Sequence, residues 1–586
     1  MDTRESKGTS SSSHDSSPTA LVSSSSSSTP LLSNTATNNS SFSAAPRNRH
    51  NQTDCTHEDA ESNNNNKRLI TKDQKSCGYD SISPALSSVS GNADYDDDSQ
   101  QHHGQYQVWE DFGGTPVEIG DYEPGFSWKK LWRYTGPGWM MSIAYIDPGN
   151  LESDLQTGAV SGYKLIWLLF LSHAVGLFVQ ILSARVGTVS GRHLAQQCRE
   201  RYPKWMTLCL WVFAEMAIIG SDIQEVIGTA VALRIITGCT MWLGILVAAV
   251  LGYVSLAIQR YGIRKTEALF VGMIGVVVVC FLIEAYMSGP KYDEFFQGLV
   301  TPKIPKEAMV QAVGMIGAVI MPHNLFLHSA LVQSRRIPRG ANARSIVKEA
   351  NFYYALESAG ALLTSFIINA AIVTVFANTY YHQTIQPRSS AFLTTLDASN
   401  GNAETPLPGL YDAADVLRKS FGKAGPFLWA IGLLSAGESS TMTGTMAGQF
   451  VMEGMLDLKI NPLLRMLVTR TLSLAPTLVV GVLASNHLDV LGEWLNVLQS
   501  IQLPFAVLPL LQISASASIM GSFATRPSLS KFGWVLAVGL ILLNGYLLLP
   551  GILGLFNKGQ LALGIVGTVT VFAYGAFLWK LSWYRF

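Results

Sequence analysis

Residues 144–156 read "AYIDPGNLESDLQ" and lie inside the first strongly apolar stretch of the chain. Four consecutive residues there are unsuited to a membrane-spanning helix: Asp147, Pro148, Gly149 and Asn150. A helix can break inside a membrane where the freed backbone lines a cavity. A carboxylate at the bilayer centre costs about 2.5–3.5 kcal/mol on insertion scales. We therefore expect Asp147 to have a partner or a function.

The rest of the chain is typical of a membrane protein with a polar extension, since 48% of its 586 residues are hydrophobic and 14% are charged. Residues 1–105 are rich in Ser and Asn and too poor in apolar residues to offset the entropy of ordering. The sequence predicts a disordered cytosolic tail over 1–105, a juxtamembrane segment over 106–127 and a transmembrane domain over 128–586.

Twelve apolar segments are each long enough to cross a bilayer, which takes about 20 residues. The predicted spans are 134–158, 163–186, 207–235, 241–259, 267–288, 308–332, 352–377, 425–448, 463–485, 488–515, 531–553 and 561–583. If successive spans cross the membrane in alternating directions, the Lys and Arg clusters all lie on one side of it. The positive-inside rule predicts that this side is cytosolic. Both termini are then cytosolic.

Several function classes lack their sequence signals. The six cysteines form no CxxC pair, so neither a disulfide framework nor a zinc site is expected. Formal net charge is zero and no basic block is interleaved with aromatic residues, which argues against a nucleic-acid partner. No Gly-rich phosphate loop, HExxH pair or nucleophile elbow is present. We expect neither an enzyme nor a bound cofactor.

The interruption recurs later in the chain. At an offset of 174 residues, "GWMMSIAYIDPGN" corresponds to "GMIGAVIMPHN", which places Asp147 opposite Met321 and Asn150 opposite Asn324. Two spans interrupted at corresponding positions indicate inverted repeats around a binding site at the membrane midplane. A proline that merely kinks each span is the alternative, and the cost of burying Asp147 favours the site.

The residue types at the two interruptions suit a metal ion. Asp147 and Asn150 offer oxygen atoms, a break frees carbonyls such as that of Ala318, and Met321 adds a thioether. Oxygen ligands alone suit Ca²⁺ or Mg²⁺, whereas sulfur favours transition metals such as Mn²⁺ and Fe²⁺. Most methionines in membrane helices only pack, but Met321 lies opposite the aspartate in the repeat.

Five stretches resemble the natural-resistance-associated macrophage proteins (NRAMP): "DPGNLESDLQ", "AIIGSDIQEVIGTA", "GAVIMPHNLFLHSALVQSR", "AGESSTMTGTMAGQFVMEG" and "LNVLQSIQLPFAVLPLL". They occur in the family's order, and the resemblance covers nearly all of 128–584. It implies an all-α, LeuT-like fold of five plus five helices, with broken helices 1 and 6. The repeats would cover about 132–288 and 306–515, and two extra helices about 531–583.

The resemblance also implies which residues bind the metal and carry protons. Its metal ligands would be Asp147, Asn150, the Ala318 carbonyl and the Met321 sulfur, with Asn496 from the tenth span and Gln499 a turn further on. Its proton route would run beside the metal site, through His323, Asp222, Glu225 and Arg470.

The proton residues also make chemical sense from the sequence. Asp222 and Glu225 are three apart on one helix face within an apolar span, which suggests a proton relay. His323 titrates nearest neutral pH, although a buried histidine can equally be neutral and hydrogen-bonded. Arg470 can instead be a snorkelling residue at a helix end. The sequence departs from the family at Glu438 and Met446, and Glu438 is either a further proton group or a wetted helix end.

The function expected from the resemblance is proton-coupled import of Mn²⁺ and Fe²⁺ into the cytosol, with Co²⁺, Zn²⁺ and Cd²⁺ as further substrates. A transporter of another small solute with the same broken helices, or a metal sensor that does not transport, are the alternatives. We expect a monomer in the plasma membrane or an endosomal or vacuolar membrane, and "STPLL" at Ser28 only slightly favours the latter.

Overall fold

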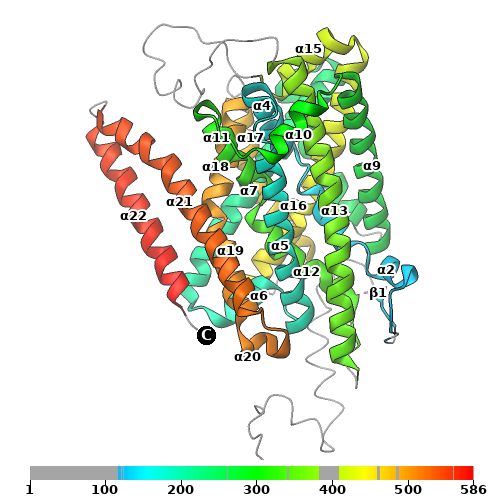
Figure 1. Cartoon of the computed structure of the whole chain (residues 1–586), viewed down its shortest axis with the longest axis vertical. Coiled ribbons are helices and arrows are strands. Elements are labelled where there is room, and N and C mark those ends of the chain that lie inside the picture. The colour runs from blue at the N-terminus through cyan, green and yellow to red at the C-terminus, as the bar shows by residue number, and fades with distance from the viewer. Residues whose placement is uncertain are drawn as a thin grey trace, which may run out of the picture. The chain divides into compact units, whose positions relative to one another are not determined.

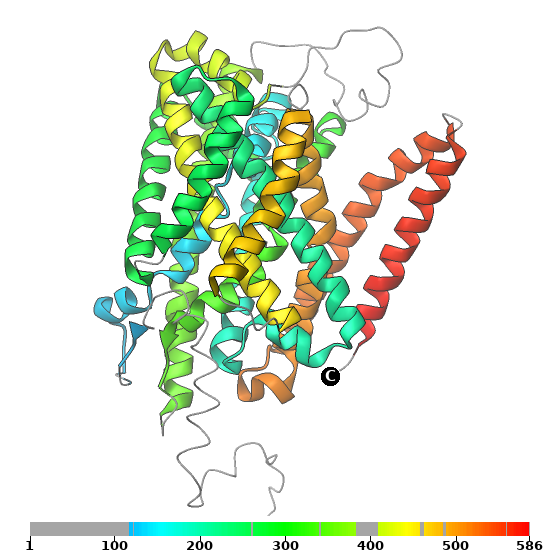
Figure 2. The same cartoon turned by 180° about the vertical axis from the view of Figure 1, so that it is seen from behind.

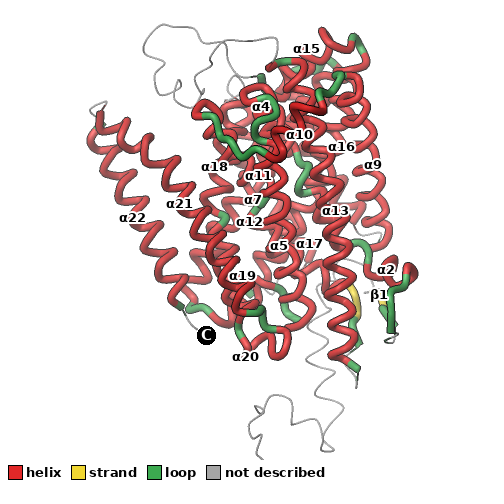
Figure 3. Tube along the Cα trace, viewed as in Figure 1, coloured by secondary structure: helices red, strands yellow, loops and turns green. Residues whose placement is uncertain are grey.

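The computed structural model describes residues 117–584, except 121, 123, 260–261, 339–341, 382–407, 458–461, 484–487 and 558–559. The predicted tail over 1–105 and half of the juxtamembrane segment therefore lie outside the described residues. Nearly all of the described chain is helical, with one small pair of strands (Figure 3).

The first half of the domain carries both interrupted helices. Its elements are β1 (Val117–Glu118), α2 (Trp128–Tyr134), α3 (Pro137–Ile143), α4 (Pro148–Ser161), α5 (Ile166–Ser190), α6 (Leu194–Arg201), α7 (Lys204–Thr237), α8 (Met241–Gln259), α9 (Ile263–Met287), α10 (Tyr292–Val300), α11 (Met309–Val319), α12 (Pro322–Leu331) and β2 (Arg335–Arg336). Short 3₁₀ turns over Lys306–Ala308 and Val332–Ser334 flank α11 and α12.

The second half continues with longer helices. Its elements are α13 (Ala343–Thr379), α15 (Leu410–Phe421), α16 (Ala424–Leu456), α17 (Pro462–Leu483), α18 (Leu488–Gln502), α19 (Pro504–Ala515), α20 (Ala517–Met520), α21 (Pro527–Asn557) and α22 (Leu561–Trp583), with a 3₁₀ turn over Gly521–Phe523. The predicted tenth span is divided into α18 and α19 just before Pro504, because proline lacks the N–H donor that a continuous helix needs.

Each of the twelve predicted spans coincides with one helix or one pair of half-helices. Within the described residues, eight helices or helix pairs are long and apolar enough to cross a membrane by length and composition. The four predicted spans outside that group correspond to α3 with α4, to α8, to α16 and to α17. The number of twelve crossings therefore stays a prediction.

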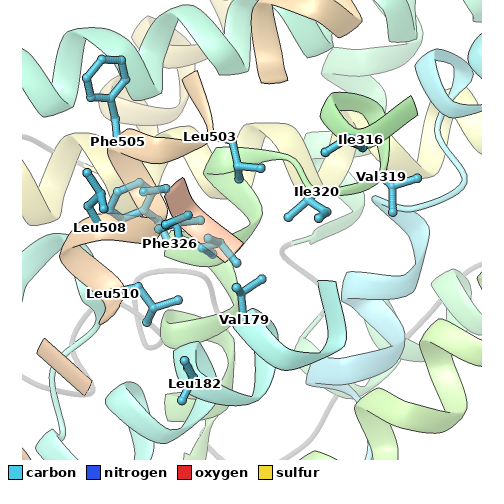
Figure 4. Close-up of a cluster of buried hydrophobic side chains, with 14 of the residues drawn as sticks. Val179, Leu182, Ile316, Val319, Ile320, Phe326, Leu503, Phe505, Leu508 and Leu510 are labelled. Carbon is cyan, nitrogen blue, oxygen red and sulfur yellow. The ribbon is translucent and has the colours of Figure 1, made fainter. Parts of the chain in front are cut away.

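The interrupted helices lie inside the bundle. In Figure 1, α4 and α11 lie in the upper half of the bundle, and α12, α2, β1 and α6 lie in the lower half. Every residue of 310–319 in α11 and of 322–331 in α12 is buried. An apolar cluster packs behind the second interruption, where Ile320 and Phe326 meet Val179 of α5 and Leu503 before α19 (Figure 4). This packing holds the broken segment in one position.

The two C-terminal helices form a hairpin at one side of the bundle, seen from behind in Figure 2. They pack against α19 through one edge, and large apolar side chains such as Val566, Val569 and Phe572 are exposed on α22. Extensive exposed apolar surface marks an interaction surface, and on helices of this length it suits contact with lipid.

A polar network at the lower end closes the base of the first helix, a feature the sequence did not predict. Strands β1 and β2 pair in parallel, which brings 117–118 beside 335–336. Arg335 is fully buried, donates to Glu267 Oε1 at 2.5 Å and donates to the carbonyl of Thr135. The chain before the first span is thus tied to the chain after the sixth.

Candidate metal site and its comparison with known proteins

The first interruption follows directly from its residues. Asp147 is the N-cap of α4 and Pro148 occupies its first turn, where a missing N–H costs nothing. Asp147 Oδ1 accepts hydrogen bonds from both the backbone N–H and the side-chain Nδ2 of Asn150, each at 2.8 Å. The carboxylate therefore marks the beginning of the second half-helix, α4.

The second interruption lies against the first. Helix α11 ends at Val319, and Met321 is the N-cap of α12, again followed by proline. Asn150 Nδ2 donates to the Ala318 carbonyl oxygen at 3.0 Å, across 168 residues of sequence. The structure thus brings three of the predicted metal-site residues, Asp147, Asn150 and Ala318, into direct contact.

In the part of the chain that the structure describes, two oxygen atoms have no hydrogen-bond partner where the first interruption, 147–150, meets the second, 318–321. We call this place the junction. Asp147 Oδ2 and Asn150 Oδ1 are buried and have no hydrogen-bond partner among the described residues. Asp147, Asn150 and Met321 are each 1% exposed. Buried polar atoms are almost always satisfied, so two free oxygens on neighbouring side chains indicate a place where a ligand binds.

Helix α18 brings Asn496 to the same junction. Asn496 Nδ2 donates to the Gly149 carbonyl at 3.1 Å, and its Oδ1 accepts from Gln224 Nε2 at 2.8 Å. Gln499 Nε2 in turn donates to Gln224 Oε1 at 3.0 Å. Asn496 is therefore next to the interruption, but its oxygen is engaged by α7 in this conformation.

Gln224 is a residue that sequence reasoning missed. It connects α7 to Asn496, to Gln499 and to the Gly492 carbonyl, which it reaches at 3.0 Å. The signal was present in "SDIQE", where a glutamine stands between two acids in an apolar span, but only the acids were singled out.

The predicted proton residues form a second buried group. Arg470 Nη1 contacts Asp222 Oδ1 at 2.9 Å, and neither side chain is more than 1% exposed. Glu225 accepts from Ser221 Oγ at 2.9 Å, while its Oε2 has no partner among the described residues. The buried ion pair rules out the alternative in which Arg470 snorkels to the membrane surface.

A glycine on α16 leaves space beside both acids. A Cβ atom at Gly444 would lie 3.4 Å from Asp222 Oδ1 and 3.4 Å from Glu225 Oε1. His323 is also buried, and its Nδ1 has no hydrogen-bond partner in the described part of the chain. Glu438, on the same helix as Gly444, is partly exposed, which distinguishes it from the buried acids.

Helix α13 supports the first interruption with side chains that sequence reasoning also missed. Asn369 Nδ2 donates to the Tyr145 carbonyl at 2.8 Å, and Ser365 Oγ donates to the Ser142 carbonyl at 3.0 Å. Glu357 accepts from the backbone N–H of Gly136 at 2.5 Å. The polar residues recur at four- and eight-residue spacing along one helix, a weak pattern within an otherwise apolar span.

The candidate site does not consist of a cluster of acids or histidines. Among the described residues, no group of three or more His, Cys, Asp or Glu side chains is placed to hold a metal. The junction offers instead one carboxylate, amide and carbonyl oxygens, and a methionine. Such a mixture is weakly charged and combines hard with soft donors.

Comparison with known proteins identifies the family. The family model for natural resistance-associated macrophage protein-like proteins matches residues 138–550. The chain belongs to the Nramp family. Its relatives include metal transporter Nramp3 of Arabidopsis thaliana, 46% identical over 466 residues that cover 78% of this chain and 86% of the relative. The metal transporter nramp1 homolog of Dictyostelium discoideum is 48% identical over 433 residues, 73% of this chain and 77% of the relative.

A solved Nramp structure has the same fold. The manganese transporter of Eremococcus coleocola, crystallised with an aromatic bis-isothiourea substituted compound, matches with a TM-score of 0.67 and 30% identity over 80% of this chain and 97% of that one. The predicted all-α, LeuT-like membrane fold is therefore confirmed. The predicted multi-pass membrane protein agrees with this family and with the long apolar helices, and the named relatives are metal transporters and not enzymes.

Proposed function

We propose that this protein is a symporter that uses protons to import Mn²⁺ and Fe²⁺ into the cytosol. The observation that carries the proposal is the junction of the two broken helices, where Asp147 Oδ2 and Asn150 Oδ1 are buried and unpartnered. The Ala318 carbonyl lies within hydrogen-bond reach of Asn150, and Met321 supplies the soft donor. Asn496 becomes a further metal ligand when the hydrogen bond between its Oδ1 and Gln224 breaks.

The ligand set selects the class of metal. A single carboxylate leaves most of the charge of a divalent ion to neutral donors, which hold Ca²⁺ and Mg²⁺ poorly because those ions need several hard oxygens. A thioether is polarizable and favours transition metals. Co²⁺, Zn²⁺ and Cd²⁺ are expected as further substrates, and an organic solute with a carboxylate would be repelled by Asp147.

Proton coupling is proposed for the group around α7. Glu225 retains an unpartnered oxygen, Asp222 is paired with Arg470, and His323 follows directly after Met321 and Pro322 on α12. Ionisable residues buried in a membrane domain are costly and mark ion and proton pathways. The membrane potential and the pH gradient then supply the energy for transport.

The proposal also includes the orientation of the protein in the membrane, its oligomeric state and its location. Both termini are cytosolic, and residues 128–586 form the transporter as a monomer. An endosomal, vacuolar or plasma membrane is the expected location. Basic residues at the lower end, among them Lys130, Arg264 and Arg335, support a cytosolic assignment of that end.

The proposal is tested by metal uptake into proteoliposomes with and without an inward pH gradient, comparing Mn²⁺, Fe²⁺, Ca²⁺ and Mg²⁺. Asp147→Asn keeps the oxygen that caps α4 but removes the charge, and Asn is as good an N-cap as Asp. We expect unchanged folding and Mn²⁺ uptake lowered by more than about tenfold, since even supporting residues of metal sites contribute 10- to 100-fold. Glu284→Gln, at a buried acid of α9, is the matched control.

Undiminished Mn²⁺ uptake by a well-folded Asp147→Asn protein would refute the site. Equal uptake of all four ions, or uptake indifferent to the pH gradient, would refute transition-metal selectivity or proton coupling respectively.

A further inference from the structure

Helix α18, which carries Asn496, ends at a break that deprives backbone carbonyls of helical partners. It ends at Gln502, and α19 begins at Pro504. The last four carbonyls of a helix find no N–H within that helix. The Ser500 carbonyl would need the N–H of residue 504, and proline has none. Inside a membrane domain, such groups must be satisfied by donors from elsewhere in the protein.

The two C-terminal helices supply these donors. Asn544 of α21 donates from Nδ2 to the Ser500 carbonyl at 2.7 Å, and its Oδ1 accepts from Ser500 Oγ at 2.8 Å. Tyr574 of α22 donates its hydroxyl to the Ile501 carbonyl at 2.9 Å. Asn544 and Ser500 are each 1% exposed. The polar residue in the apolar helix α21 thus holds both the backbone and the side chain of one residue at the end of α18.

Apolar packing keeps the two donors beside the break. Leu547 of α21 belongs to one buried cluster with Val497 of α18 and Val313 of α11. The Tyr574 ring meets the Phe505 ring of α19 edge to face, with centroids 5.4 Å apart. Figure 1 shows α21 beside α18 and α19. The C-terminal helices therefore pack against both sides of the break.

Ser500 connects the two donors to the candidate metal site. It lies one helical turn, about 6 Å, beyond Asn496 on α18. A Cβ atom at Gly317 of α11 would lie 2.6 Å from the Ser500 backbone nitrogen, so α11 passes against Ser500 directly before Ala318. Both α11 and α21 thus contact α18 at the turn that follows Asn496. That turn sets where the Asn496 side chain, bonded to the Gly149 carbonyl at 3.1 Å, can lie.

We propose that Asn544 and Tyr574 are positioning residues for metal binding, which fix the end of α18 so that the Asn496 carboxamide stays at the junction. This inference rests on the proposed transport function. Both residues bond to α18 and act on the metal through it. Without them, the buried carbonyls of Ser500 and Ile501 would lose their donors, and the turn would rearrange to find others because unpaired buried carbonyls are costly.

Mn²⁺ uptake into proteoliposomes and Mn²⁺ binding to the purified full-length protein test the inference. Asn544→Leu removes both hydrogen bonds to Ser500 at similar side-chain volume. We expect it to raise the KM and the Kd for Mn²⁺ by about tenfold, the lower end of the range for residues that orient metal ligands, with kcat little changed. The pH dependence of uptake should stay as in the wild type, because Asp222 keeps its pairing with Arg470.

Tyr574→Phe is a milder variant that keeps the ring contact with Phe505. It removes only the bond to the Ile501 carbonyl and should raise the KM for Mn²⁺ by about threefold, as the loss of one ordinary hydrogen bond does. The matched control is Tyr546→Phe, the same chemical change on α21 at a side chain that is 61% exposed. This control should keep the wild-type KM. Gel filtration and thermal unfolding check the folding of each variant.

A double-mutant cycle measures whether Asn544 acts through Asn496. Asn496→Ala alone should raise the KM for Mn²⁺, since it removes the side chain that Asn544 is proposed to position. Adding Asn544→Leu to Asn496→Ala should then raise the KM no further. Two residues that act independently would instead give effects that multiply.

The outcomes separate this inference from the proposed function. A folded Asn544→Leu protein with the wild-type KM and Kd would overturn the inference, and so would effects of Asn544→Leu and Asn496→Ala that multiply. If Asn544→Leu does not fold, equal KM values for Tyr574→Phe and Tyr546→Phe would overturn it. Each of these results leaves the transport proposal intact as long as the wild type takes up Mn²⁺ and Asp147→Asn does not. Absence of Mn²⁺ binding to the wild type would instead refute the proposed function itself.

Discussion

Asp147 divides its carboxylate between two tasks. Oδ1 accepts two hydrogen bonds from Asn150 and so starts α4, while Oδ2 remains unpartnered. A substitution that keeps the first oxygen and removes the charge therefore separates folding from metal binding. The same logic applies to Asn150, whose nitrogen reaches Ala318 while its oxygen stays unused.

Met321 is expected to decide between transition metals and Ca²⁺. We predict that Met321→Ala retains part of the Mn²⁺ uptake, because Asp147, Asn150 and a water molecule can still hold the ion. Ca²⁺ should become a substrate or an effective competitor at the candidate metal site, since the donor that disfavours it is gone. The measurement is Ca²⁺ uptake and Ca²⁺ competition against Mn²⁺ uptake in wild type and variant.

Direct Ca²⁺ uptake is the decisive quantity, because inhibition of Mn²⁺ uptake alone does not show that Ca²⁺ itself is transported. A Met321→Ala protein that transports no more Ca²⁺ than the wild type would place selectivity in the access path or in Asn496.

The buried pair between Arg470 and Asp222 is expected to matter for stability as well as for protons. Removing one partner of a buried ion pair leaves an uncompensated charge and costs about 3–5 kcal/mol. We predict that Arg470→Gln markedly lowers the unfolding temperature in detergent, and that adding Asp222→Asn restores much of it. Equal destabilisation by the single and double variants would show that the two charges are not coupled.

At the scale of elements, glycine lets α11 approach α18 at the candidate site. A Cβ atom at Gly317 would lie 2.6 Å from the Ser500 backbone nitrogen and would also collide with the Asn496 carbonyl. One helical turn earlier, a Cβ atom at Gly314 would lie 3.6 Å from Asn496 Cβ, an ordinary contact. Gly314 and Gly317 thus both face α18, but only at Gly317 is α18 too close for a side chain.

This difference gives a matched pair of substitutions. Gly317→Ala should destabilise the protein by about 1–3 kcal/mol through overpacking and lower Mn²⁺ uptake, because α18 would be pushed from the junction. Gly314→Ala should be neutral or stabilising by up to about 1 kcal/mol, since alanine favours helix. Thermal unfolding and uptake of both variants measure this, and equal effects would contradict the packing argument.

At the scale of the whole molecule, proton coupling means that metal uptake depends on protons bound at residues other than the metal ligands. We predict that wild-type uptake rises as the pH on the upper side falls, because protons then enter with the metal. In Glu225→Gln and His323→Ala this dependence should flatten, since each removes a titratable group beside the site. The measurement is Mn²⁺ uptake and proton flux against pH. Unchanged profiles in both variants would remove them from the proton route.

Much of this protein was predictable from the sequence because the signals are local. Apolar segments of bilayer length marked the helices, and proline placed both interruptions, because its missing N–H and fixed backbone angle act within one turn. Because the interruption occurs twice at corresponding positions, the sequence alone predicts Asp147 and Met321 as site residues. The residue types at that place already indicated the chemistry of the ligand.

Only the tertiary structure decided which side chains meet. Asn496 contacts Gly149 at a sequence separation of 347 residues, and Arg470 pairs with Asp222 at a separation of 248. The same packing placed Gln224 between two helices. No local pattern encodes such contacts, because they depend on how separate helices pack and which face each presents. The sequence therefore determined where the helices break and what the break offers a metal, and the packing of α4, α11 and α18 decided which oxygens stay free to bind it.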